Sequence, residues 1–198
     1  MDKQEAYKSL IAEAGVCKNC ELGCELLDGQ DPHVIGQGNL NSKIMFVAEA
    51  PGEQETIYRK CLTPPGKSGV IYEKCLKSLG LTRESVYTCN VMVCRPPGNR
   101  DPEPYEVLKC RPFLERQIGL IGAELVVSFG RFAASSFLPD FKITRDHGKV
   151  KRSQQFGVDV FPLYHPAYVG CYCPLEKREE FKRDLVVLKR LIQERGLI

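Results

Sequence analysis

The chain has 198 residues, 43% of them hydrophobic, which suits one α/β core, and we expect a single domain over residues 1–198. No stretch approaches the roughly 20 apolar residues of a membrane span and no basic-then-apolar leader opens the chain, so we expect a protein of the cytoplasm or nucleoid that has no membrane contact. The formal net charge of +3 is mildly basic and does not identify a partner by itself.

The pattern of apolar residues, Pro and Gly predicts strands that alternate with helices. Residues 2–14 have helical spacing and stop at Gly15. The later elements are, in order, a strand that opens KIMFVAEAPG (43–52), a helix in GVIYEKCLKSLGL (69–81) closed by Gly80, a strand VYTCNVMV (86–93), a helix in DPEPYEVLKCRPFLERQIGLIG (101–122), a strand AELVVSFG (123–130), a short helix RFAASSFL (131–138), a strand VDVFPLYHP (158–166) and a helix over 175–195. In the longest helical segment we expect Asp101 as N-cap and Pro102 at the first position.

This alternation favours a parallel sheet that is covered by helices on both faces. In such sheets the functional site lies at the carboxyl ends of the strands. Three unusual loops each follow a predicted strand, namely EAPGEQE (49–55), NVMVCRPPGNR (90–100) and YHPAY (164–168). We therefore expect these loops to meet in one cleft.

Ten cysteines in a chain expected in a reducing compartment are more typical of a metal or iron–sulfur site than of disulfides. Cys17 and Cys20 form C-x2-C, and Cys94 and Cys110 lie 16 residues apart. Four thiolates from two remote segments would suit zinc or an iron–sulfur cluster equally well. The other six are Cys24, Cys61, Cys75, Cys89, Cys171 and Cys173. These six cysteines could instead be ordinary core residues, because cysteine packs well as a small buried hydrophobe. We favour this interpretation for Cys75 and Cys89.

Three motifs and four cysteines together resemble the family 4 uracil-DNA glycosylases, the iron–sulfur members of the uracil-DNA glycosylase superfamily. The motifs are AEAPGEQE (48–55), NVMVCRPPGNRDP (90–102) and HPA (165–167), and the cysteines are Cys17, Cys20, Cys94 and Cys110. The resemblance implies a three-layer α/β/α fold with a four-stranded parallel sheet. It also implies a 4Fe–4S cluster held by these four cysteines.

The resemblance further implies a site in the three loops. Its expected catalytic residues are Glu49, Glu55, Asn99 and His165, and the expected base-binding residues include Ala50 and Asn90. The residue types suit N-glycosidic cleavage, because a histidine can donate a hydrogen bond to the departing base and a carboxylate or amide can orient water or stabilise the sugar cation. Each residue also has an ordinary structural alternative. Asn90 could form hydrogen bonds in a buried turn, His165 could form them at the end of a strand, and Glu55 could lie at the solvated start of a helix.

One segment departs from the family pattern. The family continues its first motif into a stretch like GRPFVGRAG, whose phenylalanine stacks on uracil, whereas this chain has YRKCLTPPGKSG (58–69). Pro64 lies nearest to the position of that phenylalanine, and Tyr58 is a candidate substitute in base binding. Loss of a stacking group costs about 1–3 kcal/mol of base binding.

A base must leave the stack to reach such a pocket, and a basic surface would hold the backbone of the nucleic acid. The loop RDHGKVKR (145–152) offers Lys149, Lys151 and Arg152 for this role, with an ordinary solvated surface as the alternative.

The leading interpretation is a monomeric DNA glycosylase that removes uracil, or a related deaminated base, from single- or double-stranded DNA in base excision repair. Two alternatives stay open: a divergent member that acts on another nucleobase or on RNA, and a non-catalytic iron–sulfur protein that binds nucleic acid. Release of free base from uracil-containing DNA separates the first interpretation from the others.

Overall fold

The structure is a computed structural model that describes residues 2–24 and 33–198. Its strands are β1 (Gln37–Gly38), β2 (Ile44–Ala48), β3 (Tyr87–Asn90), β4 (Leu125–Phe129), β5 (Lys151–Ser153) and β6 (Val158–Leu163). Its helices are α1 (Lys3–Gly15), α2 (Glu21–Cys24), α3 (Glu53–Tyr58), α4 (Lys67–Leu79), α5 (Pro104–Ile121), α6 (Gly130–Ser135), α7 (Ile143–Asp146), α8 (Pro166–Cys171) and α9 (Leu175–Glu194), with a 3-10 turn η1 (Pro97–Asn99).

The strands form a six-stranded mixed sheet in the order β1-β3-β2-β4-β6-β5. The inner strands β3, β2, β4 and β6 pair in parallel, whereas β1 and β5 add antiparallel edges. The four strands predicted from the sequence are the inner four. The expectation of a four-stranded sheet was incomplete, because edge strands of two and three residues are too short to show a hydrophobic period.

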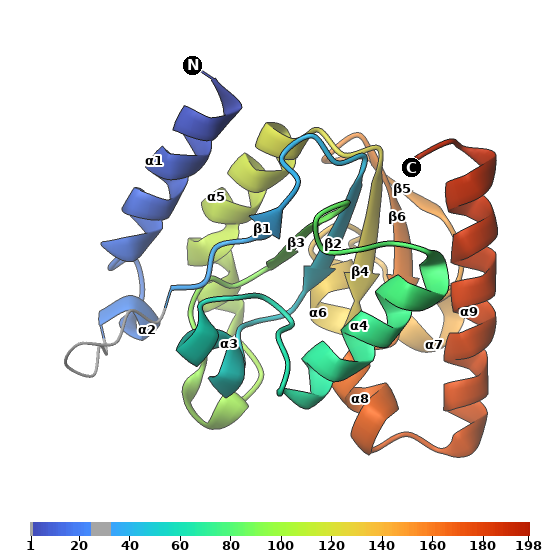
Figure 1. The fold of residues 1–198 in the computed structure, drawn as a ribbon. Coiled ribbons are helices and arrows are strands. Elements are labelled where there is room, and N and C mark those ends of the chain that lie inside the picture. The colour runs from blue at the N-terminus through green and yellow to red at the C-terminus, as the bar shows by residue number, and fades with distance from the viewer. Residues whose placement is uncertain (1, 25–32) are drawn as a thin grey trace.

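Helices cover both faces of the sheet, as Figure 1 shows. Successive residues of β2 face opposite sides: Ile44 and Phe46 belong to the core under α4 and α9, and Met45 and Val47 belong to the core under α5 and α6. All of these side chains are at most 1% exposed. A strand that is buried on both faces reads as a continuous apolar run, which is why the sequence predicted it.

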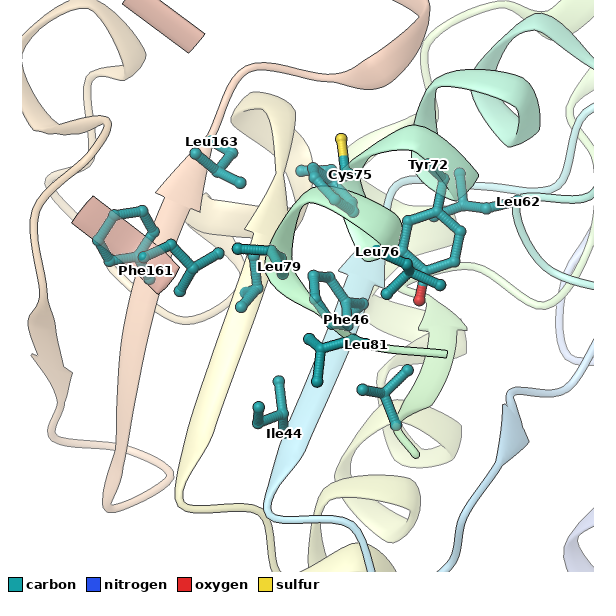
Figure 2. Packing of buried hydrophobic residues seen from close by; sticks show 14 of the residues in the cluster. Ile44, Phe46, Leu62, Tyr72, Cys75, Leu76, Leu79, Leu81, Phe161 and Leu163 are labelled. Carbon is teal, nitrogen blue, oxygen red and sulfur yellow. The ribbon is translucent and has the colours of Figure 1, made fainter. Parts of the chain in front are cut away.

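Helix α4 packs on the first of these faces (Figure 2). Tyr72, Leu76 and Leu79 point from the helix into the cluster that holds Phe46 of β2. The helix ends at Gly80, whose φ of 77° is in the left-handed region that favours glycine. This confirms the predicted end of the helix.

The start of α5 differs from the prediction. The N-cap is Glu103 with Pro104 at the first position, so the expectation of Asp101 as cap and Pro102 at the first position was wrong. The side chain of Glu106 decides this register, because its Oε2 accepts a hydrogen bond from the Glu103 amide at 2.7 Å, as in a capping box.

The last predicted helix, 175–195, corresponds to α9, which packs across the sheet face beside α4 (Figure 1). Among residues 2–24 and 33–198, no helix has both the length and the apolar composition needed to cross a bilayer.

Candidate active site

The carboxyl ends of the parallel strands bring the three predicted loops to one edge of the sheet. The amide of Met92 donates to the carbonyl of Glu49 at 2.9 Å, so the loops that follow β2 and β3 run side by side. Where β4 and β6 end, Gly130 lies against His165, and a Cβ on this glycine would be 3.1 Å from the Cβ of His165. The predicted convergence of these loops thus follows from the parallel pairing.

Asn90 is the last residue of β3 and is 1% exposed. Its Nδ2 lies 3.4 Å from Oε1 of Glu55 and 3.7 Å from Sγ of Cys61. Its Oδ1 is buried, and no group in the described part of the chain forms a hydrogen bond with it. An unpaired buried carbonyl oxygen costs free energy, so this atom is suited to receive a donor from a ligand.

Glu55 is also buried, but its carboxylate points into the protein. It accepts hydrogen bonds from the amides of Gly52, at 2.8 Å, and Leu62 and lies next to the Asn90 amide. Burial raises the pKa of Glu55, while these hydrogen bonds and the charge of Arg83 lower it. The structure therefore places Glu55 as a group that organises its surroundings, and its two oxygens are already engaged.

Glu49 directly follows β2 and is half-buried. Burial raises the pKa of its carboxyl to about 7, helped by the charge of Asp101 and opposed by that of Arg131. Asp101 and Arg131 form an ion pair with each other, which joins the loop before α5 to the start of α6. A carboxyl that titrates near neutrality is suited to acid–base chemistry.

His165 is the N-cap of α8 and is half-buried. Burial lowers the pKa of its imidazole to about 4, so the ring is neutral at physiological pH. Its Nδ1 accepts a hydrogen bond from the Ala167 amide at 3.2 Å. The single proton of the neutral ring is therefore on Nε2, which makes Nε2 a hydrogen-bond donor.

The remaining predicted catalytic and base-binding residues of the three loops are Asn99 and Ala50. Asn99 is exposed in η1 with a φ of 55°, and its Oδ1 accepts a hydrogen bond from Nε of Arg95 at 2.8 Å. Ala50 is half-buried beside the cluster that contains Cys94 and Cys110. The structure thus gives Asn99 a role in the turn of its own loop.

The two candidate substitutes for the family's phenylalanine are both at the surface. Tyr58 ends α3 and is 56% exposed, and Pro64 is exposed in the α3–α4 connection. This connection packs tightly on the first turn of α4, because a Cβ on Gly69 would lie 2.2 Å from the carbonyl carbon of Thr63. No described contact joins either candidate to Asn90.

The three predicted cations of the 145–152 loop do not form one free basic cluster. Lys151 lies 2.8 Å from Oδ1 of Asp146, and Arg152 lies 3.0 Å from Oδ1 of Asp159. Lys149 donates to the carbonyl of Arg145 at 2.9 Å. Two of the three charges are therefore offset within the protein, and that of Lys149 is not offset by a carboxylate in any described contact.

The four cysteines of the expected cluster gather beside α1 and α5. Cys94 and Cys110 are buried there, and Cys17 and Cys20 pack against the same group of residues. Sγ of Cys110 accepts a hydrogen bond from the Val93 amide at 3.2 Å. In the described residues, no three His, Cys, Asp or Glu side chains are arranged around a single metal position, so the metal site stays a prediction.

The other cysteines mostly have structural positions. Cys75 and Cys89 are at most 2% exposed in the two cores that flank the sheet, which confirms the preferred interpretation. Cys61 and Cys173 are buried, and Cys171 is half-buried. The side chain of Cys24 lies outside the described residues.

Arg83 is a residue near the site that the sequence analysis missed. It lies between α4 and β3, and its guanidinium donates to the carbonyl oxygens of Cys61, at 2.9 Å, and Leu62. A single arginine between a helix and a strand carries no motif, so only the three-dimensional contacts identify it.

Known proteins of one superfamily resemble this chain over most of its length. The model of the Uracil DNA glycosylase superfamily matches residues 35–189. A type-4 uracil-DNA glycosylase of Archaeoglobus fulgidus is 38% identical over 187 residues, which cover 91% of this chain and 90% of that protein. A type-4 uracil-DNA glycosylase of Thermotoga maritima is 35% identical over 199 residues, which cover 99% of this chain and 100% of that protein. The chain therefore belongs to the uracil-DNA glycosylase superfamily and, within it, to the type-4 uracil-DNA glycosylases.

Proposed function

We propose that this protein hydrolyses the N-glycosidic bond between uracil and deoxyribose in DNA, releasing free uracil and leaving an abasic sugar. The similarity to type-4 uracil-DNA glycosylases supports this reaction class. The observation that carries the choice of base is the buried carbonyl oxygen of Asn90, which has no partner in the described residues.

Asn90 reads the polar edge of the extruded base. Uracil has a donor at N3 and an acceptor at O4, so N3–H donates to Oδ1 of Asn90 and the N–H of Nδ2 that does not face Glu55 donates to O4. Cytosine has an acceptor at N3 and an amino group at position 4, so it presents the wrong group at both positions. Leaving buried polar groups unpaired is costly, and this cost is the source of discrimination.

His165 stabilises the leaving group. As the bond to the sugar breaks, negative charge develops on the base oxygen O2, and the Nε2–H of a neutral imidazole can donate to that oxygen. The pKa of about 4 keeps His165 neutral near pH 7, so no proton must first be removed from the ring.

Glu49 acts on the sugar side. Its carboxylate orients the attacking water or stabilises the developing positive charge at C1′. The backbone of Ala50, the next residue, lies beside the base. Glu55 is given a positioning role, since its carboxylate is buried and already accepts hydrogen bonds from Gly52 and Leu62.

A 4Fe–4S cluster is proposed on Cys17, Cys20, Cys94 and Cys110. The donor chemistry fits, because all four thiols pack around one group of buried residues and Cys110 already accepts an N–H···S hydrogen bond of the kind that tunes such clusters. When bound, the cluster would tie the segment after α1 covalently to the loop after β3 and to α5. The chain's own site residues carry the steps of the reaction.

The proposed function is tested with oligonucleotides that carry one uracil, in single-stranded DNA, double-stranded DNA and RNA, together with matched cytosine and hypoxanthine substrates. We expect release of free uracil from DNA. His165→Ala should lower the turnover by about a hundredfold, the scale of losing one oxyanion donor, while DNA affinity stays constant. Binding of DNA without release of any base would contradict the proposal, and release from RNA alone would assign a different substrate.

A further inference from the structure

Arg83 holds the α3–α4 connection from outside the site. Its side chain is only 14% exposed, and it forms an ion pair with Glu73 of α4. Its guanidinium carbon lies 5.1 Å from the ring centroid of Tyr72. Two of its remaining donors go to the adjacent carbonyls of Cys61 and Leu62, which are backbone groups of the connection. A planar arginine fork is well suited to holding two neighbouring carbonyls.

The peptide that Arg83 holds has an unfavourable backbone conformation. Leu62 has a φ of 48°, in the left-handed region, which is unfavourable for a residue with a side chain. Its carbonyl accepts from Arg83, its amide donates to Glu55, and its side chain lies beside Tyr72 in the core (Figure 2). Such a conformation persists only where the surroundings hold it from several sides.

The same peptide determines the surroundings of Asn90. Oε1 of Glu55 receives both the Leu62 amide and Nδ2 of Asn90, and Sγ of Cys61 lies 3.7 Å from the same Nδ2. An ionised carboxylate can only accept hydrogen bonds, so it keeps Nδ2 facing Glu55 and Oδ1 facing away. The groups that orient the base-reading amide are therefore the groups that Arg83 holds in place.

We propose that Arg83 is a positioning residue that fixes the orientation of the Asn90 amide, and thereby the preference for uracil over cytosine, by anchoring the Cys61–Leu62 peptide and keeping Glu55 an acceptor. This inference rests on the proposed function of the site. It concerns selectivity, because Arg83 acts through Glu55 and has no described contact with Asn90 itself.

Electrostatics act in the same direction as the geometry. Burial raises the pKa of Glu55 and the charge of Arg83 lowers it. Burial, together with the charge of Glu55, raises the pKa of the neighbouring Cys61 thiol. Without Arg83, the protonated form of Glu55 becomes more populated. A protonated carboxyl can donate to Oδ1, and the amide can then rotate and present N–H groups to the base, which match N3 of cytosine and oppose N3–H of uracil.

The test compares Arg83→Met with Glu73→Gln, which removes the ion-pair partner and leaves the anchoring of both carbonyls intact. Methionine is smaller than arginine and flexible, so it does not overfill the space that the guanidinium leaves. We expect Arg83→Met to lower kcat/KM for uracil by about tenfold and to lower the ratio of kcat/KM for uracil to kcat/KM for cytosine. Both losses should be larger at low pH, where more of Glu55 is protonated. Glu73→Gln should stay close to wild type.

Two further variants keep the test decisive if Arg83→Met fails to fold. Arg83→Lys retains the charge and loses the fork, so it should show a smaller loss. Glu55→Gln keeps the shape and introduces a donor, so its uracil-to-cytosine ratio should fall equally at every pH. The inference would be overturned if the folded Arg83 and Glu55 variants kept the wild-type uracil-to-cytosine ratio of kcat/KM and its pH dependence. It would also be overturned if Glu73→Gln lowered this ratio as much as Arg83→Met does. A wild-type protein that releases no uracil would instead overturn the proposed function.

Discussion

Burial shifts the pKa values of two site residues in opposite directions, and both shifts suit the proposed chemistry. The pKa of Glu49 rises to about 7 and that of His165 falls to about 4. Burial disfavours the charged form of each group, so it favours the neutral acid of glutamate and the neutral base of histidine. Between these two values the imidazole is already neutral, whereas the carboxylate is still being formed. The ionisation of Glu49 therefore decides the pH at which both groups are in their working forms.

We expect kcat/KM for uracil release to rise as the pH rises through about 7, because Glu49 must lose its proton to act on the sugar side. Asp101→Asn should move the midpoint to lower pH, since it removes a like charge, and Arg131→Met should move it to higher pH. Both shifts should be small and weaken with salt, because these side chains are 65% and 63% exposed. A midpoint that neither variant moves would assign the rise to another group.

The ionisation of Glu49 also affects the stability of the folded protein, and its pH dependence there is opposite to that of the activity. Because its folded pKa is raised, the native state binds this proton more tightly than the unfolded chain does. Its contribution to stability is fully present below the ordinary value of 4.5 and is lost as the pH rises through about 7. Activity and this part of the stability therefore change in opposite directions over the same pH range.

At the scale of single helices and strands, the sequence predicted the elements whose apolar pattern or end residue is visible within the element itself. The buried runs of β2, β3, β4 and β6 and the glycine end of α4 were all predicted. The start of α5 was not, because Pro102 and Pro104 both suit a first helical position and only the reach of Glu106 to Glu103 selects the second.

The site could be predicted in part for the same reason. Motifs located Asn90, Glu49 and His165 at strand ends, and the parallel pairing brings those ends to one edge. The inward direction of Glu55 could not be predicted, because it depends on the left-handed conformation of Leu62 and on contacts that are remote in sequence. Local patterns report a residue's type and spacing, whereas its direction is set by tertiary contacts.

The contact between the α3–α4 connection and α4 leads to a stability prediction. Gly69→Ala should lower the free energy of unfolding by about 1–3 kcal/mol, because the added Cβ would lie 2.2 Å from the backbone of Thr63. Gly119→Ala in α5 is the matched control. No atom lies within 4 Å of its added Cβ, so it should raise the stability by about 0.5–1 kcal/mol through helix propensity. Urea unfolding of both variants measures the difference, and equal effects would contradict the packing argument.

The junction between the loop after β3 and α5 leads to a prediction about the metal. Protein purified without oxygen should be brown and contain about four irons per chain. Cys110→Ser should remove the colour and lower the melting temperature, because Cys110 is one of the four proposed ligands. Cys75→Ala should keep the colour, since Cys75 lies in the core under α4. A colourless protein with one zinc would contradict the cluster.

At the scale of the whole molecule, the question is which positive charges remain available to DNA. The net charge is only +3, and several arginines of the site edge are paired with carboxylates, among them Arg100 with Glu106 and Arg131 with Asp101. Charges that are offset in this way release few counterions when DNA binds. We therefore propose that a small number of lysines, rather than the whole 145–152 loop, make the phosphate contacts.

Lys149 is the strongest candidate among the three cations of that loop. It follows Gly148, whose amide donates to Pro162 near the end of β6, so Lys149 lies toward the edge that carries His165, whereas Arg152 pairs with Asp159 at the start of the same strand. Lys149→Glu should weaken DNA binding and reduce the slope of log K against log salt by about 1, the value for one phosphate contact. Lys189→Glu, the same charge change at an exposed position of α9, should have a smaller effect on both quantities. Fluorescence anisotropy with uncleaved DNA over a range of salt measures both quantities, and an equal loss in the two variants would show that only the net charge matters.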